Sequence, residues 1–194
     1  EVRTEGKITL RYLGNFYGSR TPRPLVQALK EIEKEGDGIL EDVQFELVGS
    51  GHADEVRRLA EGLPEGLLTV RASVDYATSL SLMSSADALI VIDAPGAHSV
   101  FLPSKLVDYI GANRPVFGIT PPGTACKLIL ELGGRVADPA DPAAITNELM
   151  ALLTELRERR SCRSLTWGQT EVRDRFTTDA VSRDFLRMLN ELTA

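Results

Sequence analysis

Apolar residues along the chain alternate between two kinds of segment. Short runs rich in β-branched residues predict strands at residues 8–14, 43–49, 67–74, 88–93, 115–120 and 134–138. Between them, apolar residues recur every three or four positions and predict helices at residues 24–35, 53–62, 76–86, 104–112, 124–132 and 142–160. Such alternation is typical of a parallel sheet. We therefore expect an α/β fold, namely a Rossmann-like, doubly wound parallel sheet of about six strands with helices on both faces.

The end of the chain follows a different pattern. Residues 163–194 hold no strand-like run, and Val181, Phe185 and Leu189 are spaced as one face of a helix. We interpret residues 1–194 as one domain whose terminal helical segment, 163–194, packs against a neighbouring domain. The chain opens at Glu1 without a methionine, and we interpret it as a piece of a longer protein.

Composition and charge exclude several classes of function. Of the 194 residues, 43% are hydrophobic and 26% are charged, as in globular domains. A net charge of -6 argues against a broad nucleic-acid-binding or anionic-membrane surface, so any anion must be bound locally. No apolar run reaches the ~20 residues of a spanning helix. We expect a cytoplasmic domain that reaches a membrane only through sequence outside it.

Cysteine and histidine are too sparse to build a metal site. Cys126 and Cys162 lie far apart and outside any CxxC motif, which indicates reduced thiols rather than a disulfide framework. His52 and His98 are the two histidines, so a zinc site is not expected. We predict neither a metal nor a cofactor.

Candidate binding residues gather where the predicted strands end. Ligands of open parallel sheets bind beyond the carboxyl ends of the strands. After the first strand, Gly18 permits close backbone approach and Arg20 offers a bidentate clamp for phosphate, with a plain glycine turn as the alternative. After the fifth strand, Gly123 and Thr124 begin a helix whose free amides are expected to bind a phosphate or a sugar hydroxyl, unless Thr124 only caps it.

The helix predicted at residues 104–112 is the strongest lead. It is expected to begin at Pro103, with the Ser104 hydroxyl and the Lys105 ammonium in its first turn. A cation there opposes the helix dipole, and a bound anion relieves the conflict. Asp108 lies on the same face as Lys105, amid apolar neighbours, and is suited to accept hydrogen bonds from ribose hydroxyls. The alternative is a simple Lys105–Asp108 pair on the helix surface.

These stretches together resemble a known family. YLGNFYGSRTPRPLVQAL, FELVGSG, SLSLMSSADALIVID and FLPSKLVDYIGANRPVFGITPPGTA are similar to the C-terminal domain of group 1 (family 4) glycosyltransferases of the GT-B type, across residues 8–150. The most specific part is PSKLVDYIGANRPV, which resembles the family's P-x-K-x-x-E-Y-x-x-x-x-R-P motif. The resemblance implies that a nucleotide-diphosphate sugar is bound, with Gly18, Arg20 and Lys105 at the diphosphate and Asp108 at the ribose.

The resemblance also implies how the site is completed. The segment 74–80 corresponds to the family's nucleobase region. Many members carry an acid that contacts the transferred sugar eight residues before the ribose acid, but that position is Val100 here. His98 and Ser99 are the nearby candidates for sugar contacts, and Ser104, Gly123 and Thr124 for sugar or phosphate contacts.

The remaining implications concern the activity. GT-B enzymes close two domains around the donor, so this chain is expected to be the donor half, inactive alone, with the acceptor on an N-terminal domain. Family members usually retain the anomeric configuration without a metal. Two alternatives are half of a nucleotide-sugar 2-epimerase and a non-catalytic Rossmann-like module for ligand sensing or protein contacts.

Overall fold

The computed structural model describes residues 6–49, 53–161 and 167–193. The strands are β1 (Ile8–Leu13), β2 (Val43–Val48), β3 (Leu68–Arg71), β4 (Ala88–Ile92), β5 (Val116–Ile119) and β6 (Arg135–Ala137). The helices are α1 (Arg23–Glu35), α2 (Ala53–Leu59), α3 (Tyr76–Ser84), α4 (Ser104–Ala112), α5 (Thr124–Glu131), α6 (Pro142–Ser161), α7 (Thr170–Asp174) and α8 (Thr178–Thr193).

All six strands form one parallel sheet in the order β3-β2-β1-β4-β5-β6. Strand β1 pairs with β2 from Ile8 opposite Val43, and with β4 at Leu10 opposite Ala88. The spatial order therefore reverses direction at β1. Such a reversal separates the loops that follow the two neighbouring strands and leaves room for a ligand at their carboxyl ends.

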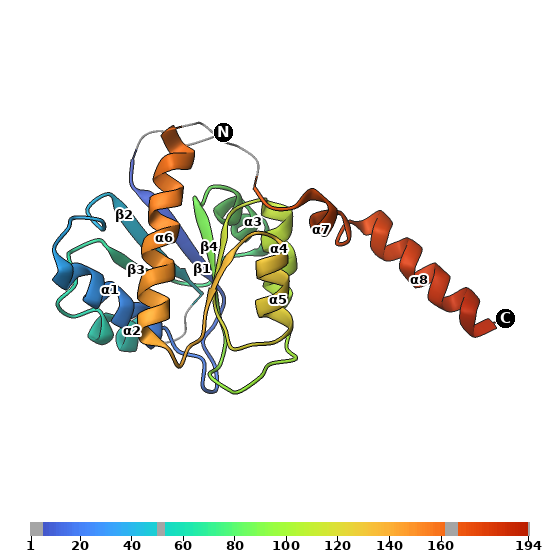
Figure 1. The fold of residues 1–194 in the computed structure, drawn as a ribbon, viewed down its shortest axis with the longest axis horizontal. Coiled ribbons are helices and arrows are strands. Elements are labelled where there is room, and N and C mark those ends of the chain that lie inside the picture. The colour runs from blue at the N-terminus through green and yellow to red at the C-terminus, as the bar shows by residue number, and fades with distance from the viewer. Residues whose placement is uncertain (1–5, 50–52, 162–166, 194) are drawn as a thin grey trace.

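Two helical layers cover the sheet, as the sequence predicts (Figure 1). Helices α1, α2 and α6 lie on one face, where Leu29 and Leu153 belong to one core cluster. Helices α3, α4 and α5 lie on the other face, where Leu106 and Ile129 belong to a second cluster. Helices α1 and α4, for example, bury side chains spaced three or four residues apart, as a single stripe facing the sheet requires. The predicted fold class is confirmed.

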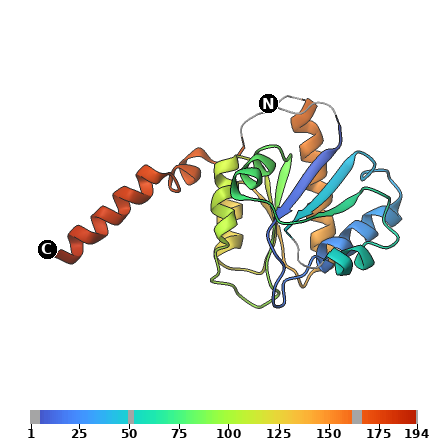
Figure 2. The same ribbon diagram turned by 180° about the vertical axis from the view of Figure 1, so that it is seen from behind.

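The terminal helical segment has two parts that pack differently. Trp167 is buried in the second core cluster, and the Gln169 amide donates to the Leu132 carbonyl at 3.2 Å, so α7 is held against the α/β body. Helix α8 points away from that body (Figures 1 and 2), and all side chains from Val181 to Leu192 are exposed. Among the residues described, every helix is too short or too polar to cross a bilayer.

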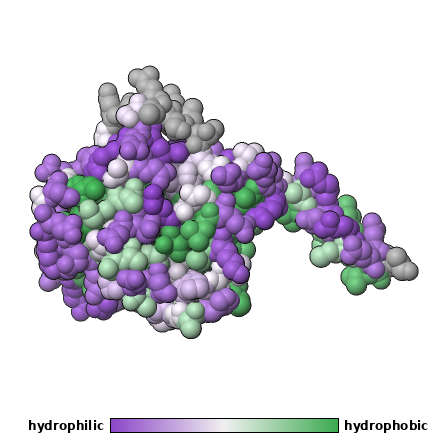
Figure 3. Space-filling model, in the orientation of Figure 1, coloured by the Kyte–Doolittle hydropathy of each residue, from purple (hydrophilic) through white to green (hydrophobic). Residues whose placement is uncertain are grey.

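Apolar side chains line the projecting helix α8 (Figure 3). The exposed ones are Val181, Phe185, Leu186, Met188, Leu189 and Leu192. Most of these positions follow the three-to-four-residue spacing of a single helical face. The structure thus contains an amphipathic helix whose apolar face has no covering element in the described chain.

Candidate functional site

The carboxyl edge of the sheet is shaped by glycines with positive φ. Gly14 follows β1 at φ 142°, and Gly123 precedes α5 at φ 150°. A Cβ on Gly14 would lie 1.8 Å from Lys105 Nζ, and one on Gly123 would lie 1.8 Å from the Ser99 carbonyl oxygen. A larger residue at Gly123 would therefore clash with the backbone of Ser99, whereas one at Gly14 would have to displace the end of the Lys105 side chain, and the positive φ disfavours both.

Lys105 is held in this edge as a partly buried cation. Helix α4 spans Ser104–Ala112, as the apolar pattern predicts, but Pro103, with an extended ψ of 127°, is its cap residue rather than its first residue. From the first turn, Lys105 Nζ reaches to 4.4 Å from the centre of the Tyr12 ring. Burial, followed by the nearby positive charge of Arg20, lowers the pKa of Lys105 to about 8. In the described parts of the chain no carboxylate pairs with it.

A pocket of about 360 Å³ lies beside Lys105, between the ends of β1 and β2 and helix α3. Its lining residues are Leu13, Gly14, Asn15, Val48, Gly49, Ser73, Val74, Ser79, Met83 and Lys105. The volume is within the range of pockets that bind small ligands, about 300–1,000 Å³. Val74 and Ser79 belong to the segment that the family resemblance relates to the nucleobase. Lys105 is the charged residue of this lining.

Asp108 lies one turn further along α4 and faces helix α3. Its Oδ1 accepts a hydrogen bond from the Tyr76 hydroxyl at 3.1 Å, so it does not form the alternative pair with Lys105. Tyr76 is the first residue of α3, where the side chain of Asp75 caps the helix by accepting from the Thr78 amide at 2.8 Å. The Asp108 contact raises the pKa of the Tyr76 hydroxyl. Sequence reasoning overlooked Tyr76, although it lies in the segment compared with the nucleobase region.

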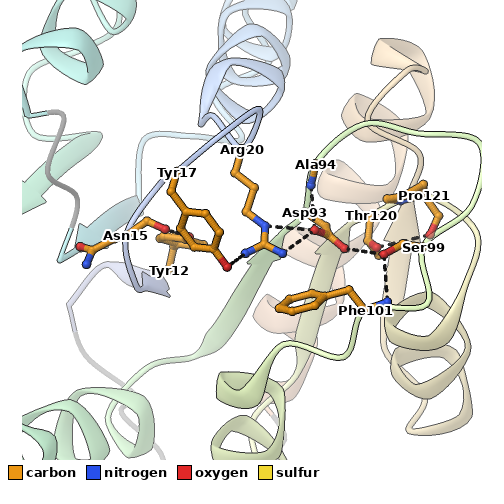
Figure 4. Close-up of polar contacts among 10 residues, drawn as sticks. All are labelled: Tyr12, Asn15, Tyr17, Arg20, Asp93, Ala94, Ser99, Phe101, Thr120 and Pro121. Carbon is orange, nitrogen blue, oxygen red and sulfur yellow. Dashed lines mark hydrogen bonds and ion pairs between the residues drawn. The ribbon is translucent and has the colours of Figure 1, made fainter.

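Arg20 is bound by a buried carboxylate that sequence reasoning missed (Figure 4). Its Nε and Nη2 donate to Asp93 Oδ1 at 3.0 and 2.8 Å. The rings of Tyr17 and Phe101 lie 4.7 and 4.5 Å from the guanidinium carbon. An aspartate directly after the wholly apolar strand β4 was the available indication of this pair.

The remaining candidates lie on the loops after β1 and β4 and, for Ser104, at the start of α4. His98, Ser104 and Gly18 are exposed, and Ser99 is half-buried with its hydroxyl donating to Asp93 Oδ2 at 3.2 Å. Val100, at the position of the family's sugar-contacting acid, is 82% exposed.

Helix α5 begins in a way that the sequence did not predict. The Thr124 amide donates to the Ser99 carbonyl at 2.9 Å, and the Ser99 amide donates to the Pro122 carbonyl at 2.8 Å. The expectation of a free amide at Thr124 is therefore wrong, because the loop after β4 already occupies it. Gly123 is the cap residue of α5, and the alternative role of Thr124 as a cap is also wrong.

The described residues contain no cluster of three or more potential metal-ligating side chains. The edge instead offers two cations, Lys105 from α4 and Arg20 from the loop after β1, close enough for one to lower the pKa of the other. Asp108 and the pocket lie beside them. Two cations, a carboxylate and a partly apolar pocket together suit a ligand in which an anionic group is joined to a polar group and a partly apolar group.

Comparisons with known proteins were made at the levels of sequence and fold. No protein-family model matches the sequence, and no curated protein matches it. Solved structures do match the fold. The pneumococcal O-GlcNAc transferase GtfA in complex with UDP and GlcNAc aligns with a TM-score of 0.64 at 16% identity, over 97% of this chain and 37% of that chain.

Two further structures match in the same way. The lipopolysaccharide outer core galactosyltransferase WaaB aligns with a TM-score of 0.66 at 14% identity, over 97% of this chain and 50% of that chain. The C-terminal domain of the group 1 glycosyl transferase LpcC from Francisella tularensis aligns with a TM-score of 0.60 at 15% identity, over 80% of this chain and 81% of that one. The chain has the fold of one half of a GT-B glycosyltransferase. It spans about a third to a half of the length of the GtfA and WaaB chains.

Proposed function

We propose that this chain binds the nucleotide-diphosphate sugar of a GT-B glycosyltransferase. The observation that carries the proposal is Lys105, a partly buried cation without a carboxylate partner among the described residues, at the border of a pocket on the carboxyl edge of the sheet. Burying an unpaired ammonium costs free energy, and a bound phosphate group offsets that cost.

Each part of the donor is assigned to a part of this edge. The diphosphate contacts Lys105 and Arg20, with Gly18 letting the loop after β1 approach it. Asp108 accepts from the ribose hydroxyls, and the base enters the pocket beside Val74 and Ser79. The complex of GtfA with UDP and GlcNAc, which has the same fold in one half, supports a donor of this class.

The proposed chemistry is transfer of the glycosyl group to an acceptor outside this chain. Positive charge placed in advance at the diphosphate stabilises the negative charge that builds on it as the sugar leaves. Lys105 and Arg20 supply that charge in the proposal, so the reaction is expected to proceed without a metal and, as in the resembling family, with retention. None of the described residues is assigned as a nucleophile, and the isolated chain is expected to be inactive.

The proposed partner is an acceptor domain in the same full-length protein. The chain matches about a third to a half of the length of the GtfA and WaaB chains, which supports a second domain. The exposed apolar face of α8 is available to pack against it. On the polar face Arg183 and Arg187 alternate with acidic residues, so an anionic membrane is disfavoured as the occupant.

Calorimetric titration of the 194-residue chain with UDP, GDP and ADP tests the donor site. We expect binding of one nucleotide in the micromolar-to-millimolar range, lost by at least about tenfold in Lys105→Ala and in Asp108→Ala. Lys7→Ala, which removes an exposed lysine near the opposite edge of the sheet, is the matched control and keeps the affinity. Absence of binding at millimolar nucleotide would instead favour a non-catalytic module.

A further inference from the structure

Asp93 is the most heavily engaged carboxylate at the carboxyl edge. It follows β4 directly and is 4% exposed. Its Oδ1 accepts three hydrogen bonds, from Arg20 Nε at 3.0 Å, Arg20 Nη2 at 2.8 Å and the Ala94 amide at 2.8 Å. Its Oδ2 accepts from the Ser99 hydroxyl at 3.2 Å (Figure 4). The carboxylate thus joins the loop after β1 to the loop after β4.

This pair occupies the side of Arg20 that a phosphate group prefers. Arginine binds carboxylate and phosphate alike through two parallel N–H donors, and Asp93 already takes the Nε and Nη2 pair. Nη1 donates to the Tyr17 hydroxyl, and the rings of Tyr17 and Phe101 lie against the guanidinium. A diphosphate that binds Arg20 through this Nε and Nη2 pair must therefore displace Asp93.

Folding stability alone does not account for the pair. The two side chains are 12% and 3% exposed, and the attraction in a buried ion pair is largely offset by the cost of removing both charges from water. The pair also affects the charge of the site. Asp93 offsets the positive charge of Arg20, whereas Lys105 has no carboxylate partner among the described residues.

We propose that Asp93 sets the anion affinity of this edge by competing with the donor's diphosphate for Arg20. The inference rests on the proposed function, because it takes a diphosphate as the ligand. In the ligand-free chain Asp93 holds Arg20 in position between the two loops. On binding, the phosphate oxygens replace Asp93 at the Nε and Nη2 donors, so part of the binding free energy is spent on breaking this pair.

Asp93→Asn removes the negative charge of the side chain but keeps its hydrogen-bond geometry. All three donors converge on Oδ1, so the amide oxygen can keep every one of these hydrogen bonds. The amide nitrogen, in the place of Oδ2, donates to the Ser99 hydroxyl oxygen. We expect UDP and inorganic pyrophosphate to bind about tenfold more tightly to this variant at low ionic strength, the size expected for a unit charge a few ångströms from an anion. The gain shrinks as salt is added.

Two variants control this titration. Glu46→Gln removes another carboxylate that pairs with an arginine, Arg11, in the middle of the sheet, and it leaves the affinity unchanged. Arg20→Gln combined with Asp93→Asn abolishes the gain, because the competition requires the guanidinium. A merely structural role of Asp93 predicts binding that is unchanged or weaker in Asp93→Asn.

The wild-type chain gives a second test that does not depend on the stability of any variant. The Nε–H resonance of Arg20, assigned by its absence in Arg20→Lys, reports the hydrogen bond to Asp93 in ¹⁵N–¹H spectra. Saturation with pyrophosphate is expected to shift this resonance. A resonance that stays unchanged while pyrophosphate binds overturns the competition.

The outcomes separate this inference from the function on which it rests. Tighter binding in Asp93→Asn that is lost in the double variant supports both. Binding that is equal or weaker in Asp93→Asn overturns the role of Asp93 and leaves the donor site standing. Absence of UDP and pyrophosphate binding in both wild type and Asp93→Asn overturns the proposed function and this inference together.

Discussion

Charged side chains are paired differently at the two edges of the parallel sheet. At the amino edge, Arg160 of α6 donates to both oxygens of Asp87 and to the carbonyls of Gly6 and Lys7, before β4 and β1. At the carboxyl edge, Lys105 is partly buried without a carboxylate partner in the described residues. At the amino edge Arg160 and Asp87 neutralise each other, whereas at the carboxyl edge the charge of Lys105 is left for a bound anion to neutralise.

This difference separates residues that stabilise the fold from residues that bind. Hydrogen-bonded polar groups at the amino edge raise the free energy of unfolding, because removing one of them leaves the others buried without a hydrogen-bond partner. A partly buried cation at the carboxyl edge lowers the free energy of unfolding until an anion binds. Substitutions at the two edges should therefore change stability and nucleotide affinity independently, and often with opposite signs.

The largest expected effect is the loss of the amino-edge network in Arg160→Met. The side chains of Arg160 and Asp87 are 14% and 12% exposed, so the variant leaves a buried carboxylate without its cation. We expect the free energy of unfolding in urea to fall by about 3 kcal/mol. The folded fraction should bind UDP as the wild type does. A loss below about 1 kcal/mol would contradict the view that this edge stabilises the fold.

Gly14→Ala tests the carboxyl edge through the backbone. The φ of 142° disfavours alanine, and the new Cβ would lie 1.8 Å from Lys105 Nζ. We expect a loss of about 2 kcal/mol in the free energy of unfolding, with nucleotide affinity reduced because Lys105 is displaced. Gly62→Ala is the control, since Gly62 also has a positive φ, 89°, but no atom lies within 4 Å of the new Cβ. Equal nucleotide affinity in both variants would show that Lys105 does not need the space at Gly14.

Lys105→Met should stabilise the fold while it abolishes anion binding. Methionine keeps the packing against Tyr12 and removes the partly buried charge, so we expect the free energy of unfolding at pH 7 to rise by about 1 kcal/mol. Lys7→Met, at the opposite edge, changes neither quantity. A fall in stability would show that Lys105 is satisfied within the chain.

The pH dependence of the wild type provides a further test of the charge on Lys105. Burial lowers the pKa of Lys105 from 10.5 to about 8 in the folded state. Between these values the unfolded chain holds a proton that the folded chain has released, so this residue makes the free energy of unfolding rise with pH from about 8 to about 10.5. Nucleotide affinity falls as the pH passes about 8, because Lys105 loses its charge. Both slopes should be absent in Lys105→Met and retained in Lys7→Met.

Much of the fold could be predicted because each element carries its own pattern. Strand β4 is wholly apolar, and α4 buries Leu106, Tyr109 and Ile110 at helical spacing. The strand order could not be derived in this way, since periodicity fixes which side of a strand is buried but not which strand lies beside it. The range of α4 agrees with the prediction, but Pro103 is its cap rather than its first residue, because the backbone of Pro103 remains extended.

The candidate site was predictable only as far as single residues allow. Lys105 and Asp108 lie in one short motif, so the sequence could relate them. Arg20 and Asp93 lie 73 positions apart, and only the pairing of the central strands brings their loops together. The Thr124 amide was misjudged for the same reason, because its acceptor, Ser99, comes from another loop. Contacts between loops follow from tertiary structure, which local patterns do not encode.

Two arginines at the amino edge, Arg157 and Arg160, differ in burial and should differ in their contribution to stability. Arg157, one turn before Arg160 on α6, pairs with Asp42 ahead of β2 and donates to the Ile39 carbonyl. Its side chain and that of Asp42 are 32% and 52% exposed, so water can replace the lost contacts in Arg157→Gln. We expect the free energy of unfolding in urea to fall by at most about 0.5–1 kcal/mol, against about 3 kcal/mol for Arg160→Met. Since both arginines come from one helix and reach the same edge, a similar loss in the two variants would mean that burial is not what makes the amino edge stabilising.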